Sequence, residues 1–243
     1  MSLDRRQFLG LSTAVAASAA FAPGLRLIEL AEARSPDEAV TSLQRWGLLI
    51  DSSKCADGCN ACVTACHEEN GVNSHGRPTT DAQWIRKVTL KDTQTGHVQS
   101  LPLMCQHCEH PPCVDVCPTG ASFRRVDGIV LVDKHICIGC RYCMMACPYK
   151  ARSFVHEVTT GQKSHAPRGK GTVESCTLCV HKVDRGDGST ACADACKKEG
   201  HQAILFGDLK DPNSEISKRL AAQPSTQLRA DLKLNTGVRY QGV

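Results

Sequence analysis

The sequence contains few of the residues and motifs on which most enzymes and nucleic-acid-binding proteins rely. Only 4% of its 243 residues are aromatic, which is a small supply for an ordinary hydrophobic core. It has no phosphate-binding glycine loop, no flavin motif and no set of nucleophile and base. Its formal net charge is only +4, which argues against a nucleic-acid-binding surface. We therefore expect a bound cofactor to supply much of the folding free energy, and we expect no bond chemistry from this chain itself.

Cysteine, in contrast, is abundant, and its sixteen residues fall into four groups of four. The third group spans residues 137–147 with the spacing Cys-x2-Cys-x2-Cys-x3-Cys, followed by Pro148. This is the bacterial ferredoxin run, in which three thiolates bind one cluster and the fourth binds a neighbouring cluster. Gly139 suits such a loop, because glycine lets the backbone fold back so that amide N–H groups face cluster sulfurs. The other groups are Cys55-x3-Cys59-x2-Cys62-x3-Cys66, Cys105-x2-Cys108-x4-Cys113-x3-Cys117, and Cys176-x2-Cys179 with Cys192-x3-Cys196.

Iron-sulfur clusters, structural zinc and disulfides could each use sixteen cysteines. Zinc usually takes two well-separated Cys-x2-4-Cys pairs, whereas three cysteines within residues 137–143 suit three corners of a cubane. Four complete groups therefore predict four 4Fe-4S clusters. Each oxidised cluster with its thiolates carries a charge of about −2, so nearby lysines and arginines are interpreted as charge compensation. A secreted zinc or disulfide scaffold is the remote alternative.

The first residues resemble an export signal. Arg5 and Arg6 precede Phe8 and Leu9 as in a twin-arginine signal, and an alanine- and serine-rich stretch follows. Residues 31–33 have the small-x-small form of a cleavage site, so we expect residues 1–33 to be a signal peptide and residues 34–243 the mature domain. An uncleaved membrane anchor is the alternative, although the apolar stretch is short and polar for a span. The resemblance implies export of a folded protein whose cysteines already hold their cofactors, which would protect them from an oxidising compartment.

Between the cysteine groups, the sequence predicts short strands and one capped helix. Apolar or alternating runs predict strands at 46–50, 84–90, 97–103, 126–133 and 151–158, with the second and third joined as a hairpin and the fourth a strand or hairpin. Glycine, proline and basic residues predict an exposed loop at 160–172. Asn213 or Ser214 is expected to cap a helix that runs through Ala222, and the remaining tail is expected to be irregular.

The chain resembles the four-cluster electron-transfer subunits of complex iron-sulfur molybdoenzymes, the DMSO reductase beta-subunit family. The order of the four groups, the Cys-Pro pairs that close the second and third groups, the widened fourth group and the stretch 206–214 carry this resemblance, which covers nearly all of residues 45–240. It implies an α+β fold of two interleaved bacterial ferredoxin-like units with inserted hairpins and long loops. Groups one and four would form one unit, and groups two and three, at 105–147, the other.

The resemblance also implies how the cysteines are shared among the clusters. Each cluster takes three cysteines from one group and one from the partner group. Some relatives lack the third cysteine of the second group and hold a three-iron cluster there, but Cys113 is present and predicts four cubanes. The implied ligand sets are Cys55, Cys59, Cys62 and Cys196; Cys176, Cys179, Cys192 and Cys66; Cys105, Cys108, Cys113 and Cys147; and Cys137, Cys140, Cys143 and Cys117.

Other residues near the cysteines are given lesser roles. His107 and His110 flank Cys108, but the cysteines already complete the ligand count, so both histidines are interpreted as turn residues or hydrogen-bond donors beside the ligands. Tyr142, Met144 and Met145 are expected to pack around clusters. Lys54, Arg141 and Lys150 are expected to raise the reduction potentials of nearby clusters by their charge; a solvated surface position is the alternative for these three.

By resemblance, the chain is a non-catalytic electron-transfer subunit of an oxidoreductase complex. The implied partner is an NrfD-like integral membrane subunit that handles quinone, with a periplasmic cytochrome c subunit or a molybdopterin catalytic subunit as a further partner. Because the sequence has no second apolar span, the mature chain is expected to be peripheral, in the periplasm on the outer face of the cytoplasmic membrane. With its own export signal, it is most similar to the periplasmic Dsr-type subunits of sulfur metabolism. The alternative is a beta subunit of a molybdopterin oxidoreductase for polysulfide or tetrathionate.

Overall fold

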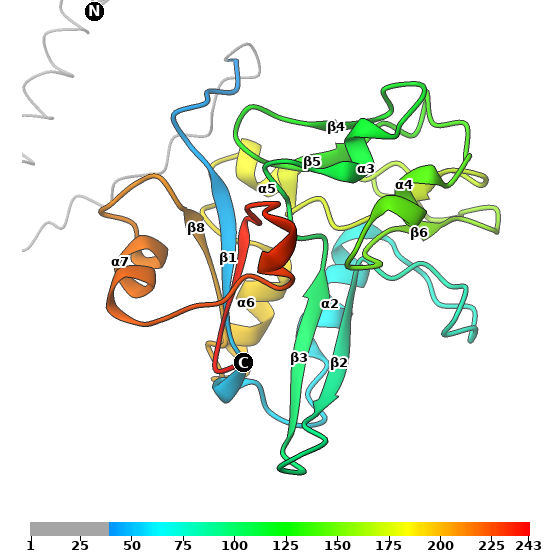
Figure 1. Ribbon diagram of the computed structural model, residues 1–243. Helices are drawn as coiled ribbons and strands as arrows, with labels where there is room; N and C mark the ends of the chain where they lie inside the picture. The colour runs from blue at the N-terminus through cyan, green and yellow to red at the C-terminus, as the bar shows by residue number, and fades with distance from the viewer. Residues whose placement is uncertain (1–38) are drawn as a thin grey trace, which may run out of the picture. The chain divides into compact units, whose positions relative to one another are not determined.

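The computed structural model describes residues 39–243, which all fall within one compact unit, Ala33–Val243 (Figure 1). The predicted signal peptide, residues 1–33, lies outside the described residues. Short helices and small sheets alternate along the chain, in agreement with the predicted α+β class. In chain order the elements are β1 (Trp46–Asp51), η1 (Ser52–Lys54), α2 (Ala61–Asn70), β2 (Ile85–Lys91), β3 (Val98–Met104), α3 (Pro112–Asp115), β4 (Ser122–Arg124), β5 (Val130–Val132), α4 (Tyr142–Ala146), β6 (Ser153–Phe154), β7 (Val173–Glu174), α5 (Val180–Asp184), α6 (Ala191–Lys198), β8 (Ile204–Asp208), α7 (Glu215–Ala222), η2 (Ala230–Leu232) and β9 (Val238–Gln241).

A three-stranded sheet with the order β8-β1-β9 joins the two ends of the described chain (Figure 1). β1 pairs antiparallel with β8 and parallel with β9. The strand predicted at 46–50 is confirmed, and consecutive residues Leu48, Leu49 and Ile50 are buried. Because neighbouring side chains of a strand point to opposite faces, this run shows that β1 is covered on both faces.

The prediction of an irregular tail is wrong for its last residues, which form β9. Val238 and Tyr240 are fully buried, and the hydroxyl of Tyr240 donates a hydrogen bond to the carbonyl oxygen of Pro102 at 3.1 Å. The strand has only four residues, and its partner β1 lies at the other end of the described chain. A pattern this short becomes a strand only when a distant partner completes its hydrogen bonds.

Three two-stranded sheets complete the β structure of the described residues. The predicted hairpin is confirmed as β2 and β3, each one residue later than expected. The strand or hairpin predicted at 126–133 is a turn followed by β5, which pairs with the unpredicted β4. The strand predicted at 151–158 is reduced to β6, because beyond it only Val155 continues the pairing, with a hydrogen bond from its N–H to the carbonyl of Thr172.

The predicted loop at 160–172 has no strand or helix, although Lys163 and Ala166 form an isolated bridge. It is not exposed throughout, because Arg168 is buried in a two-point ion pair with Glu174, with N···O distances of 2.9 and 2.7 Å. The predicted capped helix is confirmed as α7, where the hydroxyl of Ser214 accepts a hydrogen bond from the N–H of Ser217 at 3.2 Å.

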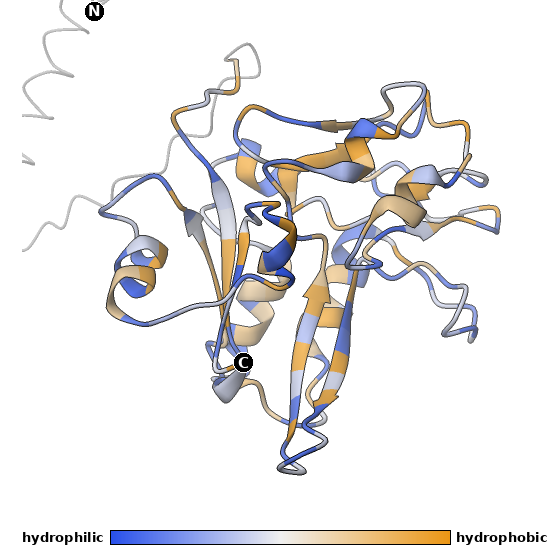
Figure 2. Cartoon of the chain, viewed as in Figure 1, coloured by the Kyte–Doolittle hydropathy of each residue, from blue (hydrophilic) through white to orange (hydrophobic). Residues whose placement is uncertain are grey.

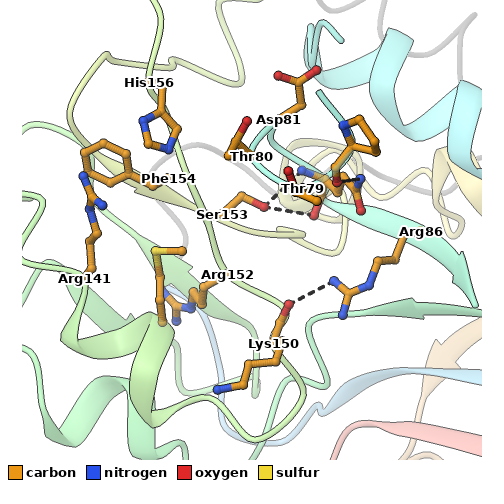
Figure 3. Close-up of a pocket in the computed structure, with 13 residues that line it drawn as sticks. Thr79, Thr80, Asp81, Arg86, Arg141, Lys150, Arg152, Ser153, Phe154 and His156 are labelled. Atoms are coloured by element: carbon orange, nitrogen blue, oxygen red, sulfur yellow. Dashed lines mark hydrogen bonds between the residues drawn. The ribbon is translucent and has the colours of Figure 1, made fainter. Parts of the chain in front are cut away.

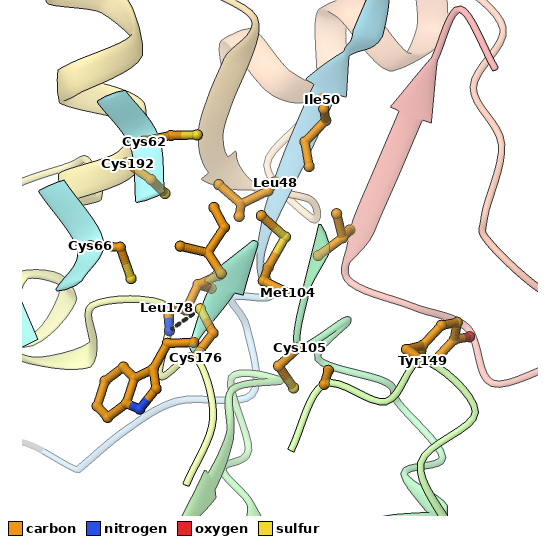
Figure 4. Packing of buried hydrophobic residues seen from close by; sticks show 14 of the residues in the cluster. Leu48, Ile50, Cys62, Cys66, Met104, Cys105, Tyr149, Cys176, Leu178 and Cys192 are labelled. Atoms are coloured by element: carbon orange, nitrogen blue, oxygen red, sulfur yellow. Dashed lines mark hydrogen bonds between the residues drawn. The ribbon is translucent and has the colours of Figure 1, made fainter. Parts of the chain in front are cut away.

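Cysteines take the place that larger apolar side chains fill in an ordinary core. Figure 4 shows Cys66, Cys105, Cys176 and Cys192 among buried apolar residues such as Leu178. In Figure 2 the hydrophobic residues are concentrated on inner elements such as β1, β3 and β5, while the tip of the β2–β3 hairpin is hydrophilic. Within residues 39–243, no helix is both long enough and apolar enough to cross a membrane.

Candidate iron-sulfur sites

All sixteen cysteines lie within the described residues and are free thiols. Four loops present them, and each loop bends through a residue with a left-handed φ. These are Gly58 (+74°), His107 (+44°), Gly139 (+68°) and Leu178 (+56°). At Gly139 no larger residue would fit, because an added Cβ would meet the carbonyl oxygen of Gly171. Each cysteine loop thus depends on at least one residue in the left-handed conformation.

The charges that act on each thiol show which cysteines lie together. Burial raises the pKa of Cys62 to about 11, and the neighbouring charges of Cys55, Cys196 and Cys59 contribute to this rise. We call Cys55, Cys59, Cys62 and Cys196 set 1. Burial also raises the pKa of Cys66, together with the charges of Cys176, Cys192 and Cys179. We call Cys66, Cys176, Cys179 and Cys192 set 2.

The same charge effects assign the other cysteines to two further sets. Burial and the charges of Cys105, Cys113 and Cys147 raise the pKa of Cys108. We call Cys105, Cys108, Cys113 and Cys147 set 3. Burial raises the pKa of Cys143, and the charges of Cys137 and Cys117 act on it as well. With Cys140 from the same loop, we call Cys117, Cys137, Cys140 and Cys143 set 4.

The charge effects between sets show which sets are neighbours. The charge of Cys62 from set 1 acts on Cys66 of set 2. The charge of Cys105 from set 3 acts on Cys176 of set 2. Finally, the charge of Cys113 from set 3 acts on Cys143 of set 4. Set 1 therefore neighbours set 2, set 2 neighbours set 3, and set 3 neighbours set 4.

Burial separates the two middle sets from the two end sets. Every cysteine of sets 2 and 3 is buried. In set 1, Cys55 and Cys59 are partly accessible, and in set 4 Cys117 and Cys137 are partly accessible while Cys140 is exposed. The line of cysteine sets thus reaches the surface of the described unit at both ends.

Backbone amides surround the sulfurs. The N–H groups of Ala203 and Ser122 donate to the sulfurs of Cys196 and Cys117 at 3.2 and 3.3 Å, and that of Leu178 donates to Cys176 at 3.4 Å. Although burial raises the pKa of Cys117, these hydrogen bonds from Ser122 and from Thr119 lower it below its ordinary value. Amide donors directed at sulfur stabilise the thiolate form that a metal requires.

The buried cysteines are better suited to bind a metal cluster with a cationic core than to remain as free thiols. Burial raises the pKa of Cys105 to about 12, against the effect of Arg152, and raises the pKa of Cys192 to about 11. Burying four thiolates together without a compensating cation is costly, whereas coordination to a metal removes the thiol protons. Four cysteines in each of four sets match in number the four thiolate ligands of a cubane cluster.

Arg152 is a residue beside the cysteine sets that the sequence did not single out. It is only 5% exposed, and its Nη2 donates to the sulfur of Cys113 at 3.1 Å and to the hydroxyl of Ser122 at 2.9 Å. Burial lowers the pKa of Arg152, but the charges of Cys113, Cys105 and Cys143 outweigh this and raise it. Because these thiols belong to sets 3 and 4, the guanidinium lies between the two sets. The only hint in the sequence is a basic residue five positions after Cys147.

Arg152 also lines a basic pocket of about 420 Å³ (Figure 3). On its wall, Arg86 donates to the carbonyl oxygen of Lys150 at 2.9 Å, and the guanidinium of Arg141 lies 3.8 Å from the ring centre of Phe154. Figure 3 shows Ser153 beside Thr79 and Thr80 on another wall. The excess of cations next to set 4 is the charge compensation expected for a cluster that carries net negative charge.

The other residues that the sequence singled out have mixed outcomes. Tyr142 and Met145 are 53% and 67% exposed and do not pack into the protein core, whereas Met144 is partly buried against it. That Tyr142 and Met145 pack around a cluster stays a prediction. The side chains are exposed because set 4 itself lies at the surface. Lys54 forms a partly exposed ion pair with Asp51 at 3.3 Å.

His107 is a buried turn residue. Its Nδ1 accepts a hydrogen bond from the N–H of Val130 at 3.0 Å, and burial lowers its pKa to about 3. The ring is therefore neutral. His110 is exposed, and its backbone N–H donates a hydrogen bond to the carbonyl oxygen of Leu234.

Comparison with known proteins agrees with this geometry. The family described as 4Fe-4S dicluster domain matches residues 96–208, and a second family with the same description matches residues 54–121. The chain is 42% identical to the Hdr-like menaquinol oxidoreductase iron-sulfur subunit 1 of Archaeoglobus fulgidus, over 98% of this chain and 97% of the relative. It is 38% identical to a tetrathionate reductase subunit of Salmonella typhimurium, over 90% and 80%, and 39% identical to the protein NrfC of Escherichia coli, over 77% and 76%. The dicluster matches and the sixteen cysteines account for four 4Fe-4S clusters.

Proposed function

This chain belongs to the family of iron-sulfur electron-transfer subunits with 4Fe-4S dicluster domains, and from that premise we propose which residues hold its four clusters and what the clusters connect. We assign one cluster to each of sets 1 to 4, so that all sixteen cysteines are ligands. The charges that the thiols of each set exert on one another support the assignment. Contacts of α2 with α6 and of α3 with α4 support two interleaved units, one from groups one and four and the other from groups two and three.

The proposed function is a linear electron relay with an entry and an exit at opposite ends of the row of sets. When bound, the clusters supply one-electron transfer at potentials that depend on hydrogen bonds, burial and nearby charge. The chain contributes buried sulfurs in sets 2 and 3, which keep the middle of the relay from solvent. The partly accessible sulfurs of sets 1 and 4 give each end of the relay contact with a partner. This pattern of burial is the observation that carries the proposal.

The relay is proposed to serve a Dsr-type complex in the periplasm, whose other members are an NrfD-like quinone-reactive membrane protein and a cytochrome c. The twin-arginine-like residues 5–6 support export, and the implied order is a signal peptide at 1–33 and a mature domain at 34–243. The relative whose name describes it as part of a menaquinol oxidoreductase supports a quinol-linked complex, because it matches 98% of the chain.

The second candidate is a beta subunit of a molybdopterin oxidoreductase of the polysulfide or tetrathionate type. The match to the tetrathionate reductase protein over 90% of the chain favours it. Both candidates use the same electron relay and differ in the enzyme complex to which it belongs.

One purification distinguishes them. The full chain is produced with its native neighbours and isolated anaerobically from membranes in mild detergent, and iron, molybdenum, tungsten and haem are counted per copy. We expect a quinone-reactive membrane subunit, about sixteen irons from this chain and no molybdenum. Stoichiometric molybdenum or tungsten would replace the quinol-linked proposal by the second candidate, and a preparation in which menaquinol reduces no cluster would contradict the quinol link.

A further inference from the structure

Two histidines and a glutamate form a compact cluster outside the four cysteine sets. Glu69 lies on α2, His165 in the 160–172 loop and His181 on α5, and their possible ligand atoms all lie within 4.8 Å of one another. The two imidazole rings are stacked, with centres 3.8 Å apart and planes 29° apart. We propose that these three side chains bind a divalent transition-metal ion of the zinc class, at a site separate from the iron-sulfur clusters.

The distances are close to those of a tetrahedral site. The Nε2 atom of His181 lies 2.8 Å from Oε1 of Glu69, and the Nε2 atom of His165 lies 3.8 Å from the same oxygen. With metal–ligand bonds of about 2.0–2.1 Å, two ligands of one tetrahedral ion lie roughly 3.3 Å apart. The two observed distances bracket that value. Small side-chain movements would thus bring the three ligands to bonding distance of one ion.

The Nε2 atoms of both histidines already face Glu69. The Nε2 atom of His165 lies 3.0 Å from the carbonyl oxygen of Glu69, which can only accept, so this nitrogen carries a hydrogen. The Nε2 atom of His181 faces the carboxylate of the same residue. A metal ion bound at Nε2 requires the ring tautomer that carries its hydrogen on Nδ1, so the hydrogen of His165 would move from Nε2 to Nδ1 on binding. Two histidines and one carboxylate are a common protein ligand set for zinc.

The elements that carry Glu69 and His181 also carry cysteines of set 2. Glu69 lies three residues after Cys66 on α2, and His181 lies two residues after Cys179. Loading of set 2 would therefore fix two of the three ligands, a form of preorganisation that favours binding.

An open hollow of about 520 Å³ gives access to the site, and its lining includes Glu69 and His165. Its charges nearly balance. Lys182 is paired with Asp194 at 2.6 Å, and Glu68 and Lys163, which also line the hollow, carry opposite charges. A fourth position open to water is the arrangement of zinc sites that have three protein ligands.

Zinc titration of the iron-loaded full chain tests the proposal. The protein is purified anaerobically, freed of loose metal with EDTA, exchanged into chelator-free buffer and titrated with Zn²⁺ by isothermal calorimetry, while the visible absorption of the clusters is followed in parallel. We expect one saturable zinc per chain, with the cluster absorption and the iron content unchanged. Glu69→Gln, His165→Gln and His181→Gln should each weaken zinc binding at least tenfold. His97→Gln, at an exposed histidine in the β2–β3 turn, should leave it unchanged.

Three results would overturn the metal site. The first is the absence of saturable binding to the wild-type chain. The second is affinity in Glu69→Gln equal to that of wild type in a variant that keeps its iron. The third is zinc uptake matched by loss of iron, which would mean that zinc enters the cysteine sets. The wild-type titration decides the question even if a variant fails to fold. Because it needs no partner or quinone, its outcome is independent of the proposed relay function.

Discussion

Neutralising Arg152 should lower the reduction potential of the cluster in set 3. The guanidinium is 5% exposed and 3.1 Å from the sulfur of Cys113, so its charge acts where water screens little. Reduction adds a negative charge to the cluster, and a nearby cation favours the reduced form. Arg152→Gln removes that cation while keeping a hydrogen-bonding side chain.

The magnitude follows from the distance. Two unit charges 3.1 Å apart interact by about 5 kcal/mol at an effective dielectric constant of 20. This is an upper limit, because the added electron is shared over the whole cluster. If a quarter to a half of the interaction is lost, the equilibrium constant for reduction falls about tenfold to a hundredfold, and the potential falls by about 60–120 mV.

The assay is an anaerobic redox titration of the iron-loaded chain followed by electron paramagnetic resonance. We expect one cluster to fall in potential by the stated amount, and a second, in set 4, to fall by less through Cys143. Arg152→Lys keeps the charge but loses the two-point contact with Cys113 and Ser122, so its shift should be smaller. Arg124→Gln, an exposed arginine on β4, is the matched control. If Arg152→Gln retains its iron and all four potentials stay at the wild-type values, the electrostatic reasoning is wrong.

Three further predictions concern the same fold. Cys140→Ser, at the exposed sulfur of set 4, should lower the iron content by up to about four atoms and stop quinone-linked electron flow; unchanged iron and activity would remove Cys140 from the ligands. Gly139→Ala should lose the cluster of set 4, since its Cβ would meet the carbonyl oxygen of Gly171, whereas Gly161→Ala, with a similar φ of +62° and open space around it, should keep its iron; equal iron counts would refute the role of the contact. Tyr240→Ala should destabilise the loaded chain by about 3–5 kcal/mol in denaturant unfolding, while Tyr142→Ala, at a side chain 53% exposed, should change the stability by less than about 0.5 kcal/mol; similar losses in both would contradict the burial of β9.

Cysteine spacing made much of the site predictable from the sequence. A run such as residues 137–147 specifies its own loop, since the spacing, Gly139 and the following Pro148 are all local signals. The same holds for the β2–β3 hairpin and for α7, whose cap at Ser214 is readable within four residues. These features depend on neighbours in the chain.

What could not be predicted depends on contacts between distant segments. Arg152 becomes a partner of Cys113 only because the chain returns beside set 3 just before β6, and no motif marks it. β9 is a strand because it pairs with β1, although the two lie at opposite ends of the described chain. The Glu69, His165 and His181 cluster likewise draws one residue from each of three separate segments. In each case the sequence supplies the side chain, and the tertiary fold supplies its partner.

The most direct test of the central claim is a count of iron and acid-labile sulfide per copy of the purified chain, joined to a count of spins after full reduction. Four cubanes predict about sixteen irons, about sixteen sulfides and four reducible centres. About eight irons, or stoichiometric zinc in place of iron, would contradict the assignment of all sixteen cysteines to four clusters.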